Sequence, residues 1–560
     1  MGVRELFRTL HREVRGLHEA AYVLASFTLA AQLAALVRDR VFAHTFGAGE
    51  TLDLFYAAFR LPDMLYALLA SAVSLFVLIP FIERAQKEGA PAVRQLMSEL
   101  FTVFSIALVV LGGMCALFAQ EIVALLYGGF DTAAQARLVP LVQVLLLQPL
   151  ILGISNLFAA YVQVRGRFLL YALAPVLYNI GIIVGALVFY PSLGEAGLAL
   201  GVVLGACLHV GIQTPFMVRE GMLPRFAMPN WCEIRTVVCV SVPRTITLSA
   251  QQLVLLVLIA LASYFAAGSI SSFTFAWNLQ SVPLALFGVS YSVAAFPTLA
   301  RLFTGGKRTE YGALIATAAK QIIFWGALAT SLLIVLRAHV VRVLLGSGEF
   351  DWNATMMTAA VFALLGCSLI AQGLVILLVR AFYAAGKTLV PLVVSMCTTG
   401  ITIGLAFWLL QAGAHGTIQT AVLASLLRVD GVPGVELLLL ALAYSIGLTI
   451  QMVLLLVLMN RHAPGFLRAL YMSSVQALCA GIVAAVVAYG ALRLFESATT
   501  LPSTTLGILL QGASAGLLGV LTWALTHAAL GSEELKTARR TISAKLGTQI
   551  QKTRGSVEGV

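Results

Sequence analysis

The feature that most constrains this chain is the recurrence of long apolar stretches. A bilayer core needs about 20 apolar residues per helix, and fourteen stretches of about that length or longer follow one another along the 560 residues. They cover residues 20–41, 53–81, 100–119, 136–161, 169–190, 195–217, 240–266, 272–299, 312–336, 355–384, 388–411, 435–459, 470–494 and 505–531. The chain is 60% hydrophobic, whereas soluble domains are about 45–50% apolar. The sequence therefore predicts an all-α integral membrane protein with about 14 transmembrane helices.

The first 19 residues differ in kind from the stretches that follow. Apolar residues recur along one helical face between four arginines, as in a helix that lies on a membrane surface. The residues are Leu6, Leu10, Val14 and Leu17, with Arg4, Arg8, Arg12 and Arg15 between them. Because thirteen more apolar stretches follow the first one, we expect an uncleaved first span rather than a signal peptide.

The distribution of Lys and Arg predicts the orientation, because cytoplasmic loops collect these residues. With the N-terminus inside, 26 of the 35 Lys and Arg fall in inner segments, seven in outer segments, and Arg60 and Lys320 within spans. This asymmetry favours fourteen helices with both termini in the cytoplasm. The net charge of +11 then reflects orientation and anionic lipid headgroups, and no nucleic-acid partner is expected.

Segments of the first half recur in the second half at a nearly constant offset. The matched segments are LLYGGFD (125–131) with LGSGEFD (345–351) and RGRFLLY (165–171) with AGKTLVP (385–391), both at an offset of 220, and FYAAFRLP (55–62) with FTFAWNLQ (273–280) at 218. Apolar helices joined by basic turns also resemble one another by chance, so this interpretation stays open. Polar positions match as well as apolar ones, which favours a true repeat.

An offset of this size spans six helices, so both copies have the same orientation and are related by an axis along the membrane normal. Two six-helix lobes of this kind are typical of alternating-access transporters, with a cavity between the lobes. We predict an amphipathic segment at 1–19, a first lobe at 20–217, a cytoplasmic linker at 218–239, a second lobe at 240–459, two extra C-terminal helices at 460–531 and a basic cytoplasmic tail at 532–560.

The glycines of the repeated corner are expected to hold related turns at the outer ends of the lobes. Gly128, Gly129 and Gly348 precede an aromatic residue and an Asp in the two copies. Glycine adopts positive backbone angles at no steric cost. We therefore expect positive backbone angles at these corners.

Motifs for enzymatic chemistry are scarce in the sequence. The seven Cys form no C-x-x-C pair and the eight His form no H-x-x-x-H pair, so no metal or redox ligand set is indicated. Isolated glycine turns at 47–49 and 305–306 are not followed by Lys-Ser or Lys-Thr, as a nucleotide-binding loop would require. We expect no enzyme activity, no cofactor and no metal.

Ionisable residues within spans are the best candidates for function, because each costs at least about 2.5 kcal/mol at a helix centre unless it faces water or a partner. Arg38 and Asp39 end the first predicted span, and Asp53 opens the second. Arg60 follows Asp53 by seven residues, close to two helical turns, so both lie on one face. Pro62 is expected to kink this helix, as is common around transport sites.

Simpler interpretations of these residues remain open. Arg38 and Arg40 can extend to the outer headgroups, and Asp53 can be only a favourable charge at a helix start. Arg60 lies two turns inside the span, where it either lines a cavity or forms an internal ion pair.

The residues around these charges resemble those of the MurJ/MviN lipid II flippases of the MOP transporter superfamily. The run RD-x(7)-GAG-x(3)-D-x-F-x(3)-F-[KR]-LP is present at residues 38–62. Further matches are RGRF at 165–168 followed by Ala174, Pro175 and Asn179, GVSYSVAAFPTLAR at 288–301, GEFD at 348–351 and RAFYAAGKTLVP at 380–391. The resemblance covers roughly residues 20–530, and the first run is specific.

The resemblance implies a flippase that moves a polyprenyl-diphosphate-linked cell-wall precursor, lipid II, from the inner to the outer leaflet by alternating access for peptidoglycan synthesis. It implies two six-helix lobes, a groove for the lipid tail made by two extra helices, and a cationic cavity for the diphosphate. It also implies a bacterial cytoplasmic membrane location, with this lipid substrate, membrane lipids and cell-wall synthesis proteins as partners. Arginine clusters suit a diphosphate because guanidinium groups bind phosphate with two parallel hydrogen bonds.

Carried over to this chain, the resemblance implies substrate binding by Arg38, Asp53, Arg60 and Asn278. Additional cavity candidates are Asp39, Gln32, Arg244, Lys320 and Arg380. The chain departs from the family at five positions that are usually charged. These are Gln32 and Asn278, where members usually carry Arg, Tyr66 and Ala67, where they carry basic residues, and Ser71, where they carry an acid.

Two other classes of function remain as alternatives. A MATE-like small-molecule antiporter of the same superfamily would need acidic residues in its cavity. A non-transporting scaffold in the envelope-synthesis machinery would be consistent with the lost cavity charges and the basic tail.

Overall fold

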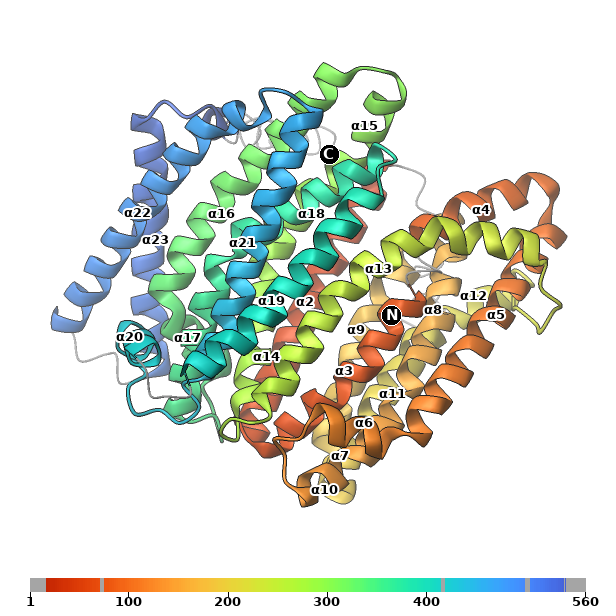
Figure 1. The fold of residues 1–560 in the computed structure, drawn as a ribbon, viewed down its shortest axis with the longest axis horizontal. Coiled ribbons are helices and arrows are strands. Elements are labelled where there is room, and N and C mark those ends of the chain that lie inside the picture. The colour runs from red at the N-terminus through yellow and green to blue at the C-terminus, as the bar shows by residue number, and fades with distance from the viewer. Residues whose placement is uncertain (1–16, 71–74, 414–417, 499–503, 538, 540–560) are drawn as a thin grey trace, which may run out of the picture. The chain divides into compact units, whose positions relative to one another are not determined.

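The computed structural model describes residues 17–70, 75–413, 418–498, 504–537 and 539, and every regular element in these ranges is a helix (Figure 1). The first half contains α2 (Leu17–Phe46), α3 (Glu50–Ala70), α4 (Leu75–Glu88), α5 (Ala90–Leu117), α6 (Ala119–Leu126), α7 (Thr132–Leu145), α8 (Leu147–Val164), α9 (Phe168–Val184), the π-helical segment η1 (Gly185–Phe189), α10 (Tyr190–Leu193), α11 (Glu195–Gly211), α12 (Thr214–Arg219) and α13 (Trp231–Ala262). The second half contains α14 (Ser269–Pro283), the π-helical segment η2 (Leu284–Val289), α15 (Ser290–Thr304), α16 (Arg308–Leu345), α17 (Trp352–Cys367), α18 (Leu369–Ala384), α19 (Leu389–Gly413), α20 (Ile418–Leu427), α21 (Leu437–His462), α22 (Phe466–Ala498) and α23 (Thr505–Ala529).

Twelve of the fourteen predicted spans coincide with helices long and apolar enough to cross a membrane. Within the described residues there are eleven such helices, or twelve when the bent pair α17 and α18 counts as one span. The other two predicted stretches, 20–41 and 53–81, fall on α2, α3 and α4. Four charged residues, Glu50, Asp53, Arg60 and Asp63, lower the hydropathy of α3. The all-α membrane fold is confirmed, whereas the count of fourteen spans is not.

The chain forms two compact units. Unit 1 contains residues Met1–Asn278, Leu344–Thr358 and Ser395–Ala443, and unit 2 contains Leu279–Val343, Ala359–Val394 and Tyr444–Val560. The predicted lobes at 20–217 and 240–459 stay a prediction. The predicted segment at 1–19 lies almost entirely outside the described residues, and so does most of the tail at 532–560.

In unit 1, α9 packs between α2 and α11, and α8 contacts α3, α4, α5 and α11. Glycines allow α9, with η1, and α11 to approach closely, since a Cβ at Gly181 or Gly185 would collide with the backbone of Gly205 or Gly201. Small residues at facing positions let membrane helices pack without a hydrophobic driving force. Helix α3 also packs against α7 and α13, and Asp53 on this helix is buried inside the unit.

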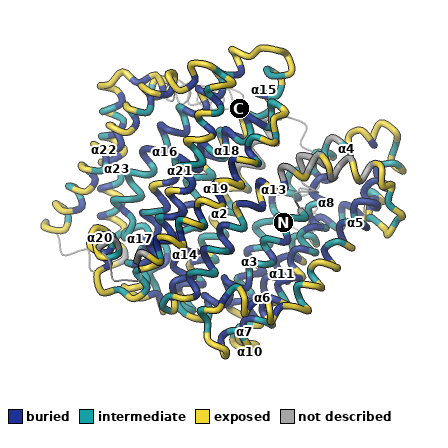
Figure 2. Tube along the Cα trace, viewed as in Figure 1, coloured by how far each residue is buried: buried dark blue, intermediate teal, exposed yellow. Residues whose placement is uncertain are grey.

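In unit 2, the largest core joins α15, α16, α18, α21 and α22. Helices α22 and α23 pack along each other (Figure 1). Buried and exposed residues alternate along both of these helices, as Figure 2 shows. Their exposed positions carry large apolar side chains such as Ile482, Val486 and Leu525, which suits contact with lipid.

The corner glycines serve different purposes in the two copies. Gly348 has a φ of +59°, as predicted, and a Cβ there would collide with the carbonyl oxygen of His44. The prediction of positive backbone angles is wrong for Gly128 and Gly129, which are absent from the positive-φ glycines of the described chain. Gly129 is needed for another reason, because a Cβ there would collide with the backbone of Ser263.

Candidate functional site

Arg38 and Asp39 form the centre of a polar cluster in unit 1. Arg38 donates to Oδ1 of Asp39 through Nη2 at 2.7 Å and Nε at 3.0 Å, and its Nη1 donates to Oδ1 of Asn179 at 3.0 Å. The other oxygen of Asp39 accepts a hydrogen bond from Nδ2 of Asn278 at 3.0 Å. Asp39 is buried, so this pairing satisfies a carboxylate that would otherwise be costly to bury. Arg38 thus points into the unit and does not extend to the headgroups.

Asp53 joins α3 to the start of α14. Its Oδ2 accepts a hydrogen bond from the backbone N–H of Gly268, and its Oδ1 accepts from both the N–H and the hydroxyl of Ser271, all at 2.7 Å. The first N–H groups of a helix have no partner within the helix and favour a negative charge. Asp53 therefore acts as a cap on a helix that begins about 215 residues further along the chain.

Arg60 lies deeper along α3 and faces both an acid and a hydroxyl. Its Nη2 donates to Oγ1 of Thr274 on α14 at 3.4 Å, and its Nε is buried without a hydrogen-bond partner in the described part of the chain. Asp63, one turn further along α3, faces Arg60 and accepts a hydrogen bond from Gln148. Asp63 is thus the candidate partner for the internal ion pair that the sequence left open for Arg60. The Nε of Arg60 stays available for a ligand.

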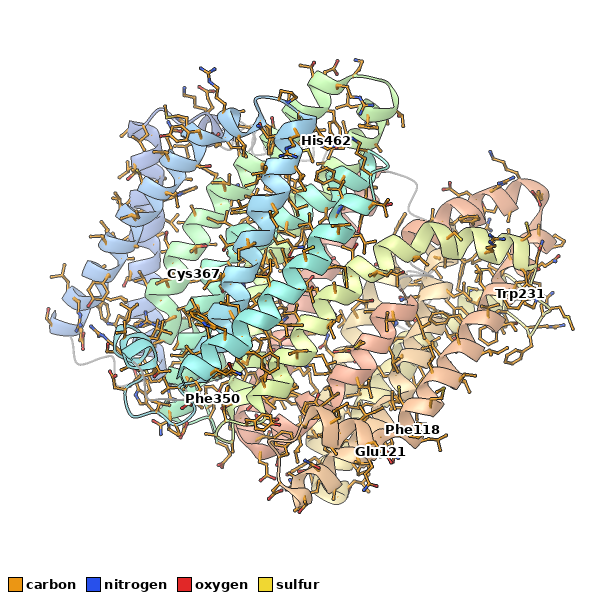
Figure 3. All side chains as sticks on the ribbon, viewed as in Figure 1. Phe118, Glu121, Trp231, Phe350, Cys367 and His462 are labelled. Carbon is orange, nitrogen blue, oxygen red and sulfur yellow. The ribbon has the colours of Figure 1, made fainter. Side chains whose placement is uncertain are left out.

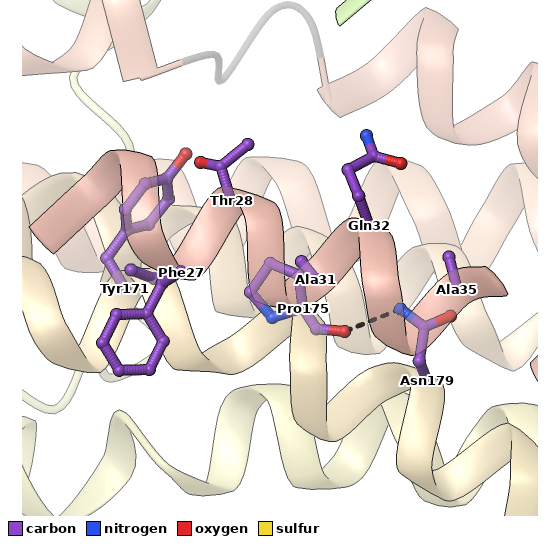
Figure 4. Close-up of a pocket in the computed structure, with 9 residues that line it drawn as sticks. Phe27, Thr28, Ala31, Gln32, Ala35, Tyr171, Pro175 and Asn179 are labelled. Atoms are coloured by element: carbon purple, nitrogen blue, oxygen red, sulfur yellow. Dashed lines mark hydrogen bonds between the residues drawn. The ribbon is translucent and has the colours of Figure 1, made fainter. Parts of the chain in front are cut away.

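A pocket of about 270 Å³ lies between α2 and α9 (Figure 4). Its polar lining comes from Thr28, Gln32, Tyr171 and Asn179. Asn179 donates to the carbonyl oxygen of Pro175 at 2.9 Å, drawn as the dashed line in Figure 4, and its other amide atom accepts from Arg38. The remaining lining residues are Phe27, Ala31, Ala35, Ala172 and Pro175. Gln32, nominated from the sequence, therefore opens onto a neutral polar pocket that Asn179 connects to Arg38.

Lys320 has a different environment, within unit 2. It lies on α16 and acts electrostatically on Glu534, which follows α23. Burial alone would raise the pKa of Glu534, but hydrogen bonds from Ser473 at 2.6 Å and Ser532 at 2.8 Å and the charge of Lys320 outweigh it, so the pKa is lowered from 4.5. Lys320 thus favours the charged form of Glu534, and the hydrogen bond from Ser473 holds the segment after α23 to α22.

The structure brings together only part of the nominated set. Hydrogen bonds join Arg38, Asp39 and Asn278 in unit 1, and Gln32 lines the pocket that Asn179 connects to Arg38. Asp53 and Arg60 contact α14 in the same unit. Arg380 belongs to unit 2, near the end of α18, and the side chain of Arg244 lies outside the described residues.

Sequence reasoning missed Asp63 and gave no role to Asn179. Asp63 follows Arg60 by three residues, a spacing that places both on one helical face, so it could have been found. The contact of Asn179 with Arg38 spans 141 residues and carries no local signal. With Asp63 included, three arginines and three aspartates lie on α2 and α3, where the family resemblance implied a cationic site.

Comparison with known proteins decides the family. A protein-family model described as "Lipid II flippase MurJ" matches residues 42–509. The chain belongs to the MurJ family. The MurJ protein of Burkholderia cenocepacia is 27% identical over 390 residues, which are 68% of this chain and 76% of that protein. A probable MurJ of Bdellovibrio bacteriovorus is 26% identical over 421 residues, which are 73% and 80% of the two chains.

Solved structures support the same fold. A MurJ flippase in an inward closed conformation has a TM-score of 0.70 at 18% identity, with 91% of this chain and 99% of that chain covered. An inward-facing multidrug MATE transporter has a TM-score of 0.60 at 15% identity, with 81% and 98% covered. As a MurJ family member, the chain is a multi-pass membrane transporter and not an enzyme.

Proposed function

We propose that this protein moves lipid II, or a closely similar polyprenyl-diphosphate-linked precursor, from the inner to the outer leaflet of the bacterial cytoplasmic membrane for peptidoglycan synthesis. The observation that carries the proposal is the family match across residues 42–509. The relatives from Burkholderia and Bdellovibrio carry the names lipid II flippase and probable lipid II flippase. The substrate partner is therefore this lipid, with surrounding membrane lipids and cell-wall synthesis proteins as further partners.

Arg60 is the best candidate for the main cation toward the diphosphate. Its Nε has no hydrogen-bond partner in the described chain, whereas Arg38 places Nε and Nη2 on Asp39. A diphosphate oxygen would satisfy the free Nε of Arg60, and the second phosphate would reach Nη2 in exchange for the long contact with Thr274. Arg38 and the polar pocket at Gln32 would then contact the more distant part of the head group.

Release of the substrate requires that the contacts between α3 and α14 open. The charge pattern predicts that the starts of these helices lie on the outer side, and Asp53 joins them there through three hydrogen bonds. In an alternating-access cycle this joint is closed while the cavity faces the cytoplasm, and it opens when the cavity faces outward. Asp53 therefore acts in gating, and Arg60 in binding.

The test is complementation of a bacterial strain depleted of its own flippase. Wild-type protein should restore growth, and Arg60→Ala should not, although it inserts in the membrane at normal levels. A desolvated contact between Arg and phosphate contributes about 1.5–3 kcal/mol, or about tenfold to a hundredfold in affinity. Arg60→Lys should recover part of the function, because Lys keeps the charge but loses the two-pronged geometry.

Two further variants sharpen this test. Arg493→Ala removes an exposed arginine that pairs with Glu496 on α22, and it should leave growth unchanged. Asn278→Arg introduces a second cation beside Asp39 and should increase the affinity for a diphosphate lipid. Full complementation by well-expressed Arg60→Ala would contradict the assignment of the diphosphate to this residue.

The MATE-like alternative is less well supported, because the three aspartates of α2 and α3 are occupied. Asp39 is held by Arg38 and Asn278, Asp53 by the start of α14, and Asp63 faces Arg60. Proton-coupled drug efflux by cells expressing the protein, without complementation, would favour that alternative. Normal expression with neither activity would favour a scaffold.

The proposed orientation has both termini in the cytoplasm, from the excess of Lys and Arg in the inner segments. A tag or cysteine near residue 305 should then be reachable only from the cytoplasm, and one near residue 420 only from outside. Labelling of position 305 from outside would contradict the orientation.

A further inference from the structure

The segment between α12 and α13 is held along the surface of α5. We call residues Met222–Trp231 the linker strap; its residues 222–230 have no regular secondary structure. Three backbone N–H groups of the strap donate to side chains of α5. Arg225 donates to Oγ of Ser98 at 3.1 Å, Ala227 to Oγ1 of Thr102 at 3.0 Å and Asn230 to Oε2 of Glu99 at 3.1 Å. In Figure 1 the strap is the yellow-green trace beside α5.

These contacts satisfy polar groups on both sides of the interface. Ser98 and Thr102 each donate their hydroxyl to a carbonyl of their own helix, so the oxygen remains free to accept from the strap. Glu99 accepts from Gln95 through its other oxygen. All three acceptors are buried, and an extended chain without helical or sheet partners needs such acceptors for its N–H groups. The strap is therefore fixed to α5 and does not hang free.

The strap lies across a surface of α5 that continues toward lipid. Residues four apart stack along one side of a helix, so Ile106 and Val110 lie on the same side of α5 as Ser98 and Thr102. Ile106 is 53% and Val110 is 52% exposed, and α5 is a candidate membrane span. Ile106 lies only about 6 Å along the helix axis from Thr102, at 1.5 Å per residue. The strap thus covers one end of a lipid-facing ridge.

The outer side of the strap carries large apolar side chains. Phe226 is 73% exposed, Met228 95% and Trp231 68%. Trp231 marks the start of α13 in Figure 3, and the ring of Phe226 lies 5.3 Å from that of Phe101 on α5. Soluble proteins seldom expose such side chains next to one another, and a contiguous apolar patch marks an interaction surface.

Exposed arginines accompany this apolar surface. Arg219, Arg225 and Arg235 are exposed within or beside the strap. Glu220, the acid that precedes the strap, is paired with Arg165 at 2.8 Å. Aromatic and long apolar side chains beside basic residues are typical of the layer where lipid headgroups meet acyl chains. Anionic headgroups attract such basic residues.

We propose that the linker strap is a lipid-binding anchor. Phe226, Met228 and Trp231 insert into the boundary between headgroups and acyl chains, and the neighbouring arginines bind the phosphates of anionic lipids. Because α13 begins at Trp231 and packs against α3, the anchor fixes the point from which α13 enters the membrane. This assignment does not depend on the transported substrate.

The test places a nitroxide spin label on the full-length protein in vesicles. Met228→Cys is labelled in a background without native cysteines, and Thr309→Cys at the charged start of α16 is the matched control exposed to water. Collisions with oxygen, which concentrates in lipid, are compared with collisions with a water-soluble nickel chelate. The vesicles contain phosphatidylcholine alone or phosphatidylcholine mixed with phosphatidylglycerol.

The ratio of oxygen to nickel collisions should be several-fold higher at position 228 than at 309, and higher still with phosphatidylglycerol. Combining Met228→Cys with Phe226→Ser and Trp231→Ser should move the ratio toward the control. Equal ratios at 228 and 309 would overturn the anchor. A label shielded from both reagents would also overturn it, because protein would then cover the strap. Equal values in the two vesicle types would overturn the role of the arginines.

Discussion

Removing the carboxylate of Asp53 should release the start of α14 from α3. Asp53→Ala eliminates three hydrogen bonds of 2.7 Å, two from backbone N–H groups and one from the hydroxyl of Ser271. The N–H groups of Gly268 and Ser271 cannot find partners inside α14, because Gly268 precedes this helix and Ser271 lies in its first turn. The variant should therefore favour arrangements in which this joint is open and water reaches the helix start.

The size of the effect follows from the groups left without a partner. A buried donor that loses its acceptor costs about 1–3 kcal/mol, so two N–H groups give about 2–6 kcal/mol. Water entering at the opened helix start recovers part of this cost, so about 2–3 kcal/mol remains. At 1.4 kcal/mol per factor of ten, the equilibrium between closed and open forms should shift by about thirtyfold to a hundredfold.

The assay is a distance measurement between two spin labels in vesicles. Leu125 on α6 and Leu426 on α20 are both highly exposed, belong to unit 1 and lie in different predicted lobes. In the wild-type background the distance distribution should have one dominant population. Asp53→Ala should add a second population that becomes the major one.

Asp131→Ala provides the matched control. Asp131 also accepts a hydrogen bond of 2.7 Å from a backbone N–H, that of Ala134, but it caps its own helix α7. Asp131→Ala should remove a similar local hydrogen bond without changing the distance distribution between the two spin labels. An unchanged distribution in Asp53→Ala, or an equal change in Asp131→Ala, would refute the assignment of Asp53 as the joint between α3 and α14.

Two further predictions concern other parts of the chain. Gly348→Val should reduce the yield of monodisperse protein in size-exclusion chromatography, because Gly348 has a positive φ. Gly129→Val should also reduce this yield, because a Cβ at position 129 would collide with backbone atoms. Normal yields of both variants would refute this prediction. The lowered pKa of Glu534 implies that its stabilisation is complete above pH 4.5 and is lost as the pH falls through the folded-state value. Thermal unfolding in detergent between about pH 6 and about pH 3 should show this loss in wild type and not in Glu534→Gln; equal pH profiles would contradict it.

The helices could be predicted from the sequence because burial in a bilayer requires length and hydropathy, which are properties of local sequence. The two predicted stretches that match no candidate membrane span of the described chain, 20–41 and 53–81, carry charges that we nominate for the site. Asp53, Arg60 and Asp63 make α3 less apolar than an ordinary span, so the features that nominate the site also obscure the helix that carries it.

The contacts of the site could not be predicted, because they join segments far apart in sequence. Arg38 and Asp39 are neighbours in the chain, so their ion pair is a local contact. The amides that complete the cluster, Asn179 and Asn278, come from 141 and 239 residues away from their partners. An uncharged amide gives no signal by itself, and only its position beside a buried ion pair gives it a role.

The contact between Asp53 and Ser271 nevertheless joins two residues whose separation matches an offset of the predicted repeat. The two residues are 218 apart, the offset at which FYAAFRLP repeats as FTFAWNLQ. Tyr56 and Phe275, 219 apart, also meet, with ring centroids at 5.9 Å. When two copies are related by a two-fold axis, a residue close to the axis contacts its own equivalent. The predicted repeat would give separations at or within one residue of its offset if its axis passed between α3 and α14.

Symmetry alone would place like residues opposite each other on such an axis, and two aspartates there would repel. In the predicted repeat the opposite groups are complementary instead: Asp53 accepts from Ser271, and Arg60 has Asn278 as its equivalent. Because only one copy keeps the cation, a diphosphate bound near the axis would interact more strongly with α3 than with α14. Opening of the joint would then leave the head group bound to Arg60. Release of the head group would depend on Asp63, the acid beside Arg60, which competes with the diphosphate for the guanidinium group. Asp63→Asn should accordingly slow release while strengthening binding, which a comparison of lipid affinity with transport rate in vesicles can measure. A variant with weaker binding and faster transport would show that Asp63 does not oppose the hold of Arg60 on the diphosphate.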